Sequence, residues 1–524
     1  MGTKTKFSRH HILMIAMILL STVITLFLST QKINYHLDEL LTYSLSNGTD
    51  YINIKPGETY ELYGKHQESF LTPSGETRFN YQNVWKNQAE DVHPPFYYTI
   101  FHTISSFMPG EFTKYIGISI NIFFNALIIL LLYKFSMLIT NSRKAAYLTS
   151  LFWAVNPGIM SDMMFIRMYI MTMFFCLLIS YVHVKFMKDV TPSNSRFFLS
   201  LFLVSLGGAL THYYFIVFTF FVCALFVFYL LYKKQIKHLL MYVGTYILTI
   251  LAVLGIFPSV YDHIFGGESR GQESMENLMN MGDYLGSIQG FWRIISNTLF
   301  GGVLLIAVFA IGILLIMISL RKRKIVKTDH DRQSVLDRPS IWNIVYLLTT
   351  CSLYFLLIAK IAVYSAERYM QPIYPIIILT FTALLYHAIQ YFSKRAPVFI
   401  VSAALVLISI NGYVNTTNFE YLRLQSEEAI ELAEKYSDKD SIVIFDRVWK
   451  IPASYVELSN YKTVTFYDKS KLNPLYQNTD YDEFVLYVHG EAAPIVKDIV
   501  NKLPQIISYK KLSSYAYTDV YYLQ

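Results

Sequence analysis

Residues 36–45 read HLDELLTYSL and follow directly on the first strongly apolar segment of the chain, residues 11–29. The leucines of this stretch recur at helical spacing, so one side of a short helix here is apolar. We expect the helix to lie flat on a bilayer, with its leucines in the lipid and its two adjacent acids, Asp38 and Glu39, in water. Neighbouring residues on a helix do not face each other, so the two acids should do different jobs. We interpret Asp38 as the working carboxylate; the alternative is an ordinary solvated acidic pair.

The composition of the whole chain is that of a protein with many membrane spans. Of the 524 residues, 54% are hydrophobic and 15% are charged, and the mean hydropathy is +0.36. A soluble protein carries about 25% charged residues. The net charge of +7 is assigned to loops that set topology, so we expect no binding to nucleic acid.

The cysteines and the N-terminus bear on the compartment. Cys176, Cys223 and Cys351 all lie inside apolar segments, so no disulfide framework or thiolate metal site is expected. The first apolar segment has a basic start but no small-residue cleavage site after it, which predicts a retained helix and not a removed signal peptide. These features favour a multi-pass protein of a bacterial plasma membrane.

The apolar runs predict eleven membrane spans. Cytoplasmic loops are enriched in Lys and Arg, and every second predicted loop is basic, which places the N-terminus in the cytoplasm and the C-terminus outside it. Two spans, 145–160 and 197–211, are shorter than the ~20 residues that cross a bilayer, and we expect them to continue beside the next helix. The eleven predicted spans are residues 11–29, 114–139, 145–160, 163–186, 197–211, 213–232, 238–258, 294–319, 341–363, 370–391 and 397–414.

Two polar regions on the outer side interrupt the spans. Residues 30–112 contain the acid pair and a second apolar helix that is too short to span, residues 96–108. Pro94 and Pro95 suit the first turn of that helix, which we expect to be interfacial. Residues 259–293 contain three closely spaced glycines and little apolar pattern, and they are predicted to be mobile.

The third outer region is the tail. Strand-like runs (SIVIFD, KTVTFY, EFVLYVHG) alternate in it with helix-like runs (EEAIELAEKY, APIVKDIVNKL), and a closing strand pair is expected in QIISYKK and DVYYL. This alternation predicts a small α/β domain. The expected organisation is a helical membrane domain over residues 1–414 and an extracytoplasmic α/β domain over residues 415–524.

Ionisable groups near a membrane need a reason, because each costs ~2.5–3.5 kcal/mol at membrane depth on insertion scales. Arg167 lies near the outer end of the fourth span, where it could snorkel, pair with Asp162 or bind a ligand. His212, between two apolar spans, could be a satisfied structural histidine. Glu367 and Arg368, at a late outer junction, could pair with each other.

The candidate residues share the predicted outer leaflet. Cations gathered there would hold the phosphate of a lipid head group, and an acid would act on a polar acceptor arriving from outside. A divalent metal could also bind at an O/N site formed by Asp38, Glu39, His93 and His212, although no spacing motif supports such a site. The candidates are Asp38, Glu39, His93, Arg167, His212, Glu367 and Arg368.

Several short motifs in a fixed order carry a resemblance. DE after the first span, HPPFYY, RMY, THYY and ERYMQPIYP resemble the GT-C membrane glycosyltransferases, and among them glycosyltransferase family 39, the protein O-mannosyltransferases and lipid A aminoarabinose transferases. The resemblance covers roughly residues 10–415. It implies a GT-C fold, a polyprenyl-phosphate sugar donor and an inverting transfer to an extracytoplasmic glycan, lipid or protein. The tail does not match the larger soluble domains of some eukaryotic relatives, which counts against protein O-mannosylation.

The resemblance also implies roles for residues. Asp38 matches the acid that takes the acceptor proton, with Glu39 beside it, and one carboxylate suffices for a single displacement, whereas a retaining enzyme needs a nucleophile and a separate acid/base. Arg167 and Arg368 match positions near the lipid phosphate, and His93 stands where relatives often carry Lys or His. The expected donor-binding set is His93, Arg167, Tyr169, His212, Tyr213, Glu367 and Arg368.

Two other functions compete with this interpretation. A transporter or flippase of lipid-linked glycans would explain the many spans, but it predicts interrupted helices in related halves, and the sequence has no such repeat. A glycan polymerase or ligase would share the donor and differ in the reaction.

Overall fold

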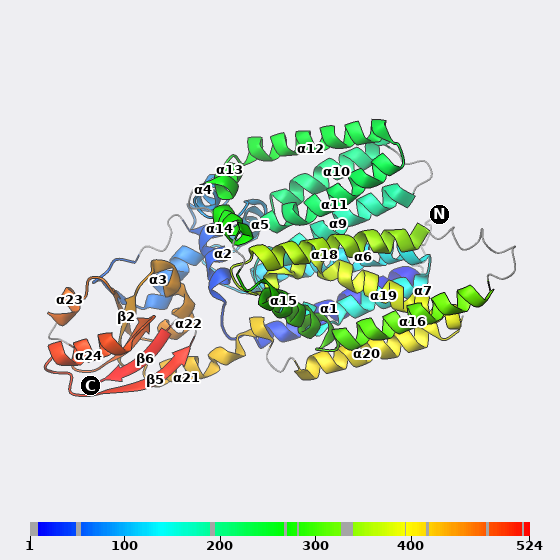
Figure 1. Cartoon of the computed structure of the whole chain (residues 1–524). Helices are drawn as coiled ribbons and strands as arrows, with labels where there is room; N and C mark the ends of the chain where they lie inside the picture. Colours follow the sequence, from blue (N-terminus) through cyan, green and yellow to red (C-terminus); the bar gives the residue numbers. More distant parts are fainter. Residues whose placement is uncertain are drawn as a thin grey trace, which may run out of the picture.

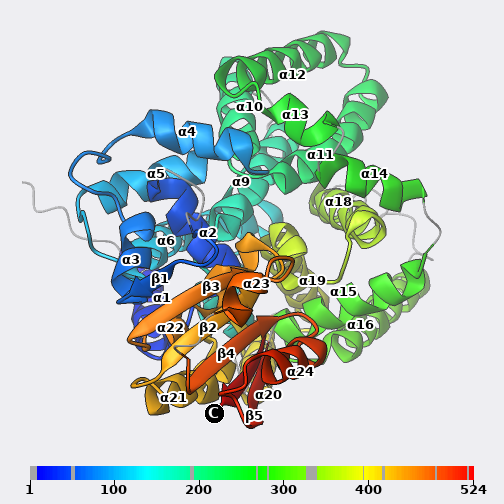
Figure 2. The same cartoon turned by 90° about the vertical axis from the view of Figure 1, so that its left-hand side faces the viewer.

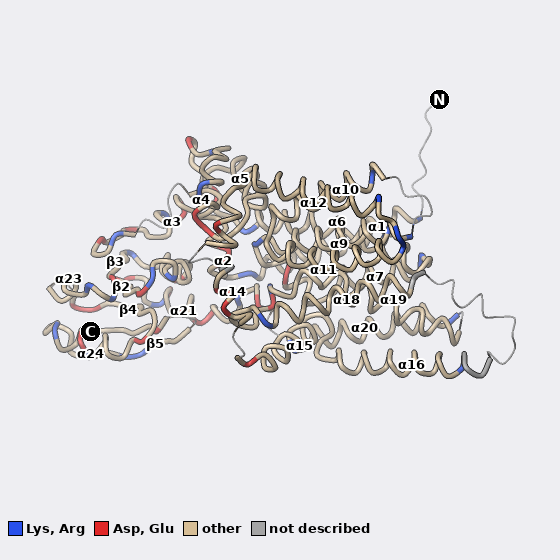
Figure 3. Tube along the Cα trace, turned by 45° about the horizontal axis from the view of Figure 1, so that its top comes forward, with Lys and Arg blue, Asp and Glu red and all other residues tan. Residues whose placement is uncertain are grey.

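The computed structural model describes residues 9–48, 54–188, 194–266, 270–279, 282–325, 339–393, 395–415, 419–477, 481–515 and 518–524. A bundle of long helices carries a small domain with a sheet at one end (Figure 1). Lys and Arg gather at the end of the bundle that lies away from the sheet domain (Figure 3). The acids of the helical part lie at the other end, close to the sheet domain. This is the arrangement expected when basic loops lie on one side of a membrane. The orientation of the termini relative to the cell stays a prediction.

Within the described residues, nine helices are long and apolar enough to cross a membrane. α7 (Arg143–Ala154) and α10 (Asn194–Ala209) are shorter, so the predicted count of eleven spans is not confirmed. After a break, α7 is followed by a further short helix, α8 (Pro157–Asp162). The nine long helices are α1 (Arg9–Thr30), α6 (Tyr115–Thr140), α9 (Tyr169–Lys188), α11 (Tyr213–Tyr232), α12 (Ile236–Ile256), α16 (Leu304–Ile325), α18 (Pro339–Ile361), α19 (Tyr374–Phe392) and α20 (Pro397–Asn415).

The predicted span 294–319 is broken in the structure. α15 (Tyr284–Phe300) ends directly before Gly301, and α16 starts at Leu304. The φ angles of Gly301 and Gly302 between them are 59° and 90°. Glycine adopts these angles without strain. A Cβ at Gly301 would also lie 2.6 Å from the backbone nitrogen of Gly412, so this turn fits only glycine. The break separates α15 from the membrane-spanning α16.

The first outer region is folded against the end of the bundle. It contains α2 (Leu37–Asn47), α3 (Tyr63–Leu71), α4 (Tyr81–Glu90) and α5 (Phe96–Ser106). Pro95 is the N-cap of α5, so the two prolines precede the helix and do not occupy its first turn. Tyr97, Tyr98 and Phe101 of α5 are fully buried, which makes this helix part of the core.

The second outer region is largely helical, with α13 (Val260–Phe265) and α14 (Arg270–Met279) before α15. Residues 267–269 and 280–281 lie outside the described residues, and its mobility stays a prediction.

The tail forms the predicted α/β domain. Its parallel strands are β2 (Asp440–Phe445), β3 (Thr463–Asp468) and β4 (Phe484–His489), and β5 (Tyr509–Tyr515) and β6 (Thr518–Leu523) pair antiparallel at one edge. The helices include α21 (Glu427–Lys435), α22 (Tyr455–Leu458), α23 (Asn473–Tyr476) and α24 (Ala493–Lys502). β2, β3, β4, β6 and the longer helices lie where the alternation of the sequence placed them, whereas β5 begins four residues after the start of the predicted run QIISYKK.

One strand of this sheet comes from the first outer region. β1 (Thr59–Glu61) pairs antiparallel with β3, with Tyr60 opposite Val464, and the sheet order is β1-β3-β2-β4-β6-β5. Figure 2 shows β1 at the sheet edge, next to β3. The sheet therefore includes residues that we assigned from the sequence to the membrane domain. The prediction missed β1 because a strand of three residues is too short to show an alternating pattern.

Candidate functional site

α2 begins with a capping box. His36 Nδ1 accepts a hydrogen bond from the Asp38 N–H at 3.0 Å, and Glu39 Oε2 accepts one from the His36 N–H at 2.6 Å. These two bonds satisfy N–H groups that a helix start leaves unpaired. Both acids lie in the first turn, where the helix dipole favours negative charge.

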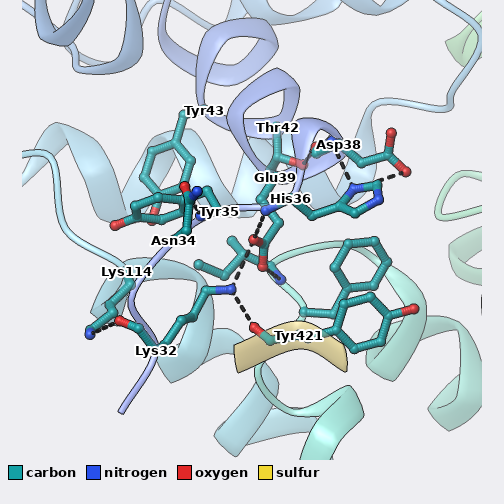
Figure 4. Close-up of polar contacts among 12 residues, drawn as sticks. Lys32, Asn34, Tyr35, His36, Asp38, Glu39, Thr42, Tyr43, Lys114 and Tyr421 are labelled. Carbon is teal, nitrogen blue, oxygen red and sulfur yellow. Dashed lines mark hydrogen bonds and ion pairs between the residues drawn. The ribbon is translucent and has the colours of Figure 1, made fainter. Parts of the chain in front are cut away.

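Glu39 is a fully buried anchor (Figure 4). Besides the His36 N–H, its carboxylate accepts hydrogen bonds from Lys32 Nζ at 2.9 Å and from the Ile166 N–H at 2.8 Å. Lys32 Nζ also donates to the Tyr421 carbonyl at 2.6 Å. The expectation that both acids face water is therefore wrong for Glu39, because its carboxylate joins α2 to Lys32 and to the backbone at Ile166.

Asp38 points away from Glu39 (Figure 4). Its side chain is 22% exposed, and Oδ2 lies 3.6 Å from Arg368 Nη1 and 3.8 Å from His36 Nδ1. Burial alone would raise the pKa of Asp38, but the charges of Arg167 and Arg368 outweigh it and lower the pKa to about 2. Asp38 is thus an ionised carboxylate that a small molecule can reach.

Arg167 is buried, and its guanidinium faces α2 and α5. Nη1 donates to the Asp38 carbonyl at 3.2 Å, to Thr42 Oγ1 at 3.1 Å and to Tyr98 OH at 3.0 Å. Nη2 lies 3.2 Å from His93 Nε2, and Nε has no hydrogen-bond partner among the described residues. These contacts fix the position of the guanidinium, and its unpaired Nε–H is buried.

His93 orients this guanidinium. Its Nδ1 lies 2.7 Å from Asp91 Oδ2. Because arginine can only donate, Nε2 of His93 must accept and Nδ1 must carry the proton that Asp91 accepts. Burial lowers the pKa of His93, which fits this neutral form. Sequence reasoning missed Asp91; the available signal was an acid two residues before the histidine.

His212 lies between His93 and Tyr169 in a row of ring contacts. The His212 ring centroid is 5.9 Å from that of His93 and 5.3 Å from that of Tyr169. His212 is the N-cap of α11, and its Nδ1 accepts a hydrogen bond from the Tyr214 N–H at 2.9 Å. The ring thus has a structural task and also lines the site.

Tyr213 and Glu367 of the predicted set turn elsewhere. The Tyr213 hydroxyl lies 2.6 Å from His263 Nδ1 on α13. Glu367 Oε1 accepts a hydrogen bond from Thr298 Oγ1 at 2.9 Å, whereas Arg368 faces Asp38. The suggested pairing of Glu367 with Arg368 is therefore wrong: the two adjacent side chains diverge.

Asp162 is not the partner of Arg167 either. Its Oδ1 accepts a hydrogen bond from Gln371 Nε2 at 2.7 Å. Burial and the neighbouring Glu367 carboxylate raise the pKa of Asp162. Burial and the charge of Glu420 raise the pKa of Glu367. The two acids form a second polar cluster, distinct from the one around Asp38.

The cluster around Asp38 can bind an anion. It presents two guanidinium groups, an ionised carboxylate and two histidines at one end of the bundle. The metal site suggested for Asp38, Glu39 and the two histidines does not form, because Glu39 faces away. Among the described residues, no three His, Cys, Asp or Glu side chains gather as metal ligands.

Comparisons with known proteins find one matching family model and similar solved structures. Residues 92–262, less than half of the chain, match the family model of dolichyl-phosphate-mannose-protein mannosyltransferases. ArnT from Cupriavidus metallidurans bound to undecaprenyl phosphate is similar in structure, with a TM-score of 0.54 and 9% identity over 97% of both chains. No curated protein matches the sequence.

Two further solved structures are more distant. The apo state of the same ArnT has a TM-score of 0.48 and 10% identity, over 92% of this chain and 96% of that one. An oligosaccharyltransferase from Archaeoglobus fulgidus, solved with Zn and sulfate, has a TM-score of 0.46 and 10% identity, over 94% of this chain and 69% of that one. The family model and the ArnT structure confirm the resemblance, and this multi-pass membrane protein has the fold of the GT-C glycosyltransferases.

Proposed function

We propose that the protein is a membrane glycosyltransferase that moves a sugar from a polyprenyl-phosphate donor to an acceptor hydroxyl with inversion. The observation that carries the proposal is the partly exposed, ionised carboxylate of Asp38, which lies 3.6 Å from Arg368, while Arg167 donates to the Asp38 backbone carbonyl. The mannosyltransferase family model and the ArnT structure with undecaprenyl phosphate support the same chemistry.

In this proposal the two arginines bind the donor phosphate. Arg368 Nη1 is 3.6 Å from Asp38 Oδ2, and the Arg368 side chain is 16% exposed, so a phosphate can reach it. Arg167 is buried and would act on the phosphate through its charge. A guanidinium fork matches phosphate oxygens well. The arginines stabilise the charge that grows on the phosphate as the sugar leaves, so the leaving group needs no general acid.

Asp38 takes the proton of the acceptor hydroxyl. With the arginine charges directed at it, Asp38 has a pKa of about 2 and is a weak base. A bound phosphate would neutralise part of those charges, and the pKa of Asp38 would rise. The base is thus strengthened when the donor is in place, which favours transfer from a loaded site.

The other polar residues hold this arrangement. Asp91 and His93 orient Arg167, and Glu39 with Lys32 fixes the start of α2. Such supporting contacts keep reacting groups at productive distances. Glu39 is therefore assigned a positioning role, and the catalytic assignment rests on Asp38.

We place this site on the extracytoplasmic face of a bacterial plasma membrane, with an N-terminus in the cytoplasm. The C-terminal domain lies at the same end of the bundle as α2 (Figure 1), so an acceptor glycan, lipid or protein would arrive beside it. The expected partners are the lipid-linked donor, this acceptor and the surrounding lipids.

The test uses the full chain in proteoliposomes with undecaprenyl-phosphate sugars labelled in a hexose or a pentose. Membranes from a deletion strain supply the acceptor. Transfer predicts that label enters the acceptor with inverted configuration while undecaprenyl phosphate accumulates. A flippase would move the intact donor across the bilayer and form no undecaprenyl phosphate, and this outcome would reject the proposal.

A further inference from the structure

A second polar cluster lies beside the anion site and has no part in the proposed transfer. It joins the end of α8, α15, two short 3₁₀ helices, η1 (Glu367–Tyr369) and η2 (Gln371–Ile373), and the start of α19. Asp162 accepts a hydrogen bond from Gln371 at 2.7 Å, and Glu367 accepts one from Thr298 at 2.9 Å. The cluster consists of Asp162, Thr298, Glu367, Gln371 and Tyr374.

The two acids of this cluster face each other, and a buried amide oxygen beside them has no partner among the described residues. Asp162, Gln371 and Tyr374 are at most 1% exposed. The carboxyls of Asp162 and Glu367 lie within hydrogen-bonding reach of each other, as do the hydroxyls of Tyr374 and Thr298. Gln371 Oε1 makes no hydrogen bond within the described part of the chain. Buried polar atoms are nearly always satisfied, so each exception needs an explanation. Two carboxyls that face each other and an unpaired amide oxygen beside them indicate a missing positive or donating group.

The charges of the cluster also indicate that a cation is missing. The groups that act electrostatically on Asp162 and Glu367 are acids or neutral side chains, namely each other, Glu420, Thr298 and Gln371. Burial raises the pKa of both carboxyl groups, because a buried pair of like charges is costly without a cation. Arg368, which is next in sequence to Glu367, is directed at Asp38.

We propose that this cluster binds a hard divalent cation, Ca²⁺ by preference. The ligands would be the carboxylates of Asp162 and Glu367 together with the amide oxygen of Gln371 and the hydroxyls of Thr298 and Tyr374. All-oxygen sites suit Ca²⁺ and Mg²⁺, whereas zinc prefers nitrogen and sulfur. Ca²⁺ tolerates irregular geometry, while Mg²⁺ demands a near-ideal octahedron.

A cation here would fix the spacing of the two arginines of the anion site. Glu367 directly precedes Arg368, and Asp162 ends the helix that leads to Arg167. α8 and α15 already pack closely, since a Cβ at Gly158 would lie 2.3 Å from Thr298. The cation would complete this junction, and its binding does not depend on which reaction the anion site performs.

Terbium luminescence tests the site, because Tb³⁺ replaces Ca²⁺ and the Tyr374 ring can sensitise it. The probe is added to the purified full chain after EDTA treatment. We expect saturable luminescence that Ca²⁺ displaces, and a rise in unfolding temperature when Ca²⁺ is added. Glu367→Gln and Asp162→Asn should each weaken Ca²⁺ competition at least tenfold, whereas Asp262→Asn, an exposed acid on α13, should leave it unchanged.

Equal Tb³⁺ binding by the wild type and both folded variants would overturn the site. The site would also be overturned if Ca²⁺ left the unfolding temperature unchanged and only acidification raised it. The two carboxyls would then share a proton instead of binding a cation. No sugar transfer is measured, so failure here is distinct from failure of the proposed function.

Discussion

The two acids at the start of α2 are neighbours in sequence and differ in almost every other respect. Glu39 is fully buried, and its oxygens bind Lys32 and two backbone N–H groups. Asp38 is partly exposed and lies opposite Arg368 at 3.6 Å. The difference shows how one pair divides its tasks: the acid with satisfied oxygens holds the fold, and the acid with reachable oxygens stays available for chemistry.

The largest expected effect on stability is that of Glu39→Gln. It leaves the Lys32 ammonium buried without its carboxylate, and breaking a buried pair costs ~3–5 kcal/mol. The unfolding temperature of the purified protein should drop strongly, and adding Lys32→Met should recover much of the loss. Asp38→Asn is the matched control, and an equal loss of stability in both variants would erase the contrast between the acids.

On the Asp38 side, Arg368→Ala should weaken donor use. Losing one charged partner of a desolvated phosphate costs ~2–5 kcal/mol, so the donor KM should rise at least about tenfold. Arg368→Lys should rescue only part, because lysine lacks the fork. Arg293→Ala, an exposed arginine of α15, serves as the control, and a normal donor KM in Arg368→Ala would reject the phosphate role.

A smaller effect is expected for Asp91→Asn. The His93 Nδ1–H then loses its charged acceptor, which costs about 1–3 kcal/mol, and Arg167 becomes less well oriented. kcat/KM should fall by ~5–150-fold, while the unfolding temperature changes little. Unchanged kcat/KM would mean that His93 does not position Arg167.

The smallest expected effect is the response of the free enzyme to acid. The pKa of Asp38 is lowered to about 2, so the carboxylate stays ionised at every pH well above that value. kcat/KM should therefore show no acid limb from Asp38 between about pH 5 and 8. Arg368→Ala removes one of the charges that lower the pKa of Asp38, so the acid limb of kcat/KM should move to higher pH. A wild-type acid limb near pH 6 that Asp38→Asn abolishes would contradict the low pKa of Asp38.

The sequence predicted the features that depend on periodicity. Long apolar runs located the long helices other than α16, leucine spacing located α2, and alternating runs located most strands and the longer helices of the tail. Gly301 and Gly302 were visible inside a predicted span, and adjacent glycines of this kind are a signal for a break.

Features that depend on tertiary contacts could not be predicted. Lys32 precedes α2 outside any helical pattern, so no spacing rule joins it to Glu39. Glu367 and Arg368 looked like a pair because they are adjacent, but their side chains diverge to Thr298 and Asp38. Contacts between distant segments decide these partners.

The most direct test is single-turnover transfer with Asp38→Asn and a bound polyprenyl-phosphate sugar. This change keeps the shape of the side chain and removes the base, so the rate should fall by ~10²–10⁴-fold while donor binding survives. Glu39→Gln, compared at a temperature where it is folded, should be milder in this step. If Asp38→Asn turns over at the wild-type rate, Asp38 is not the base, and if Glu39→Gln is then inactive, the roles of the two acids are reversed.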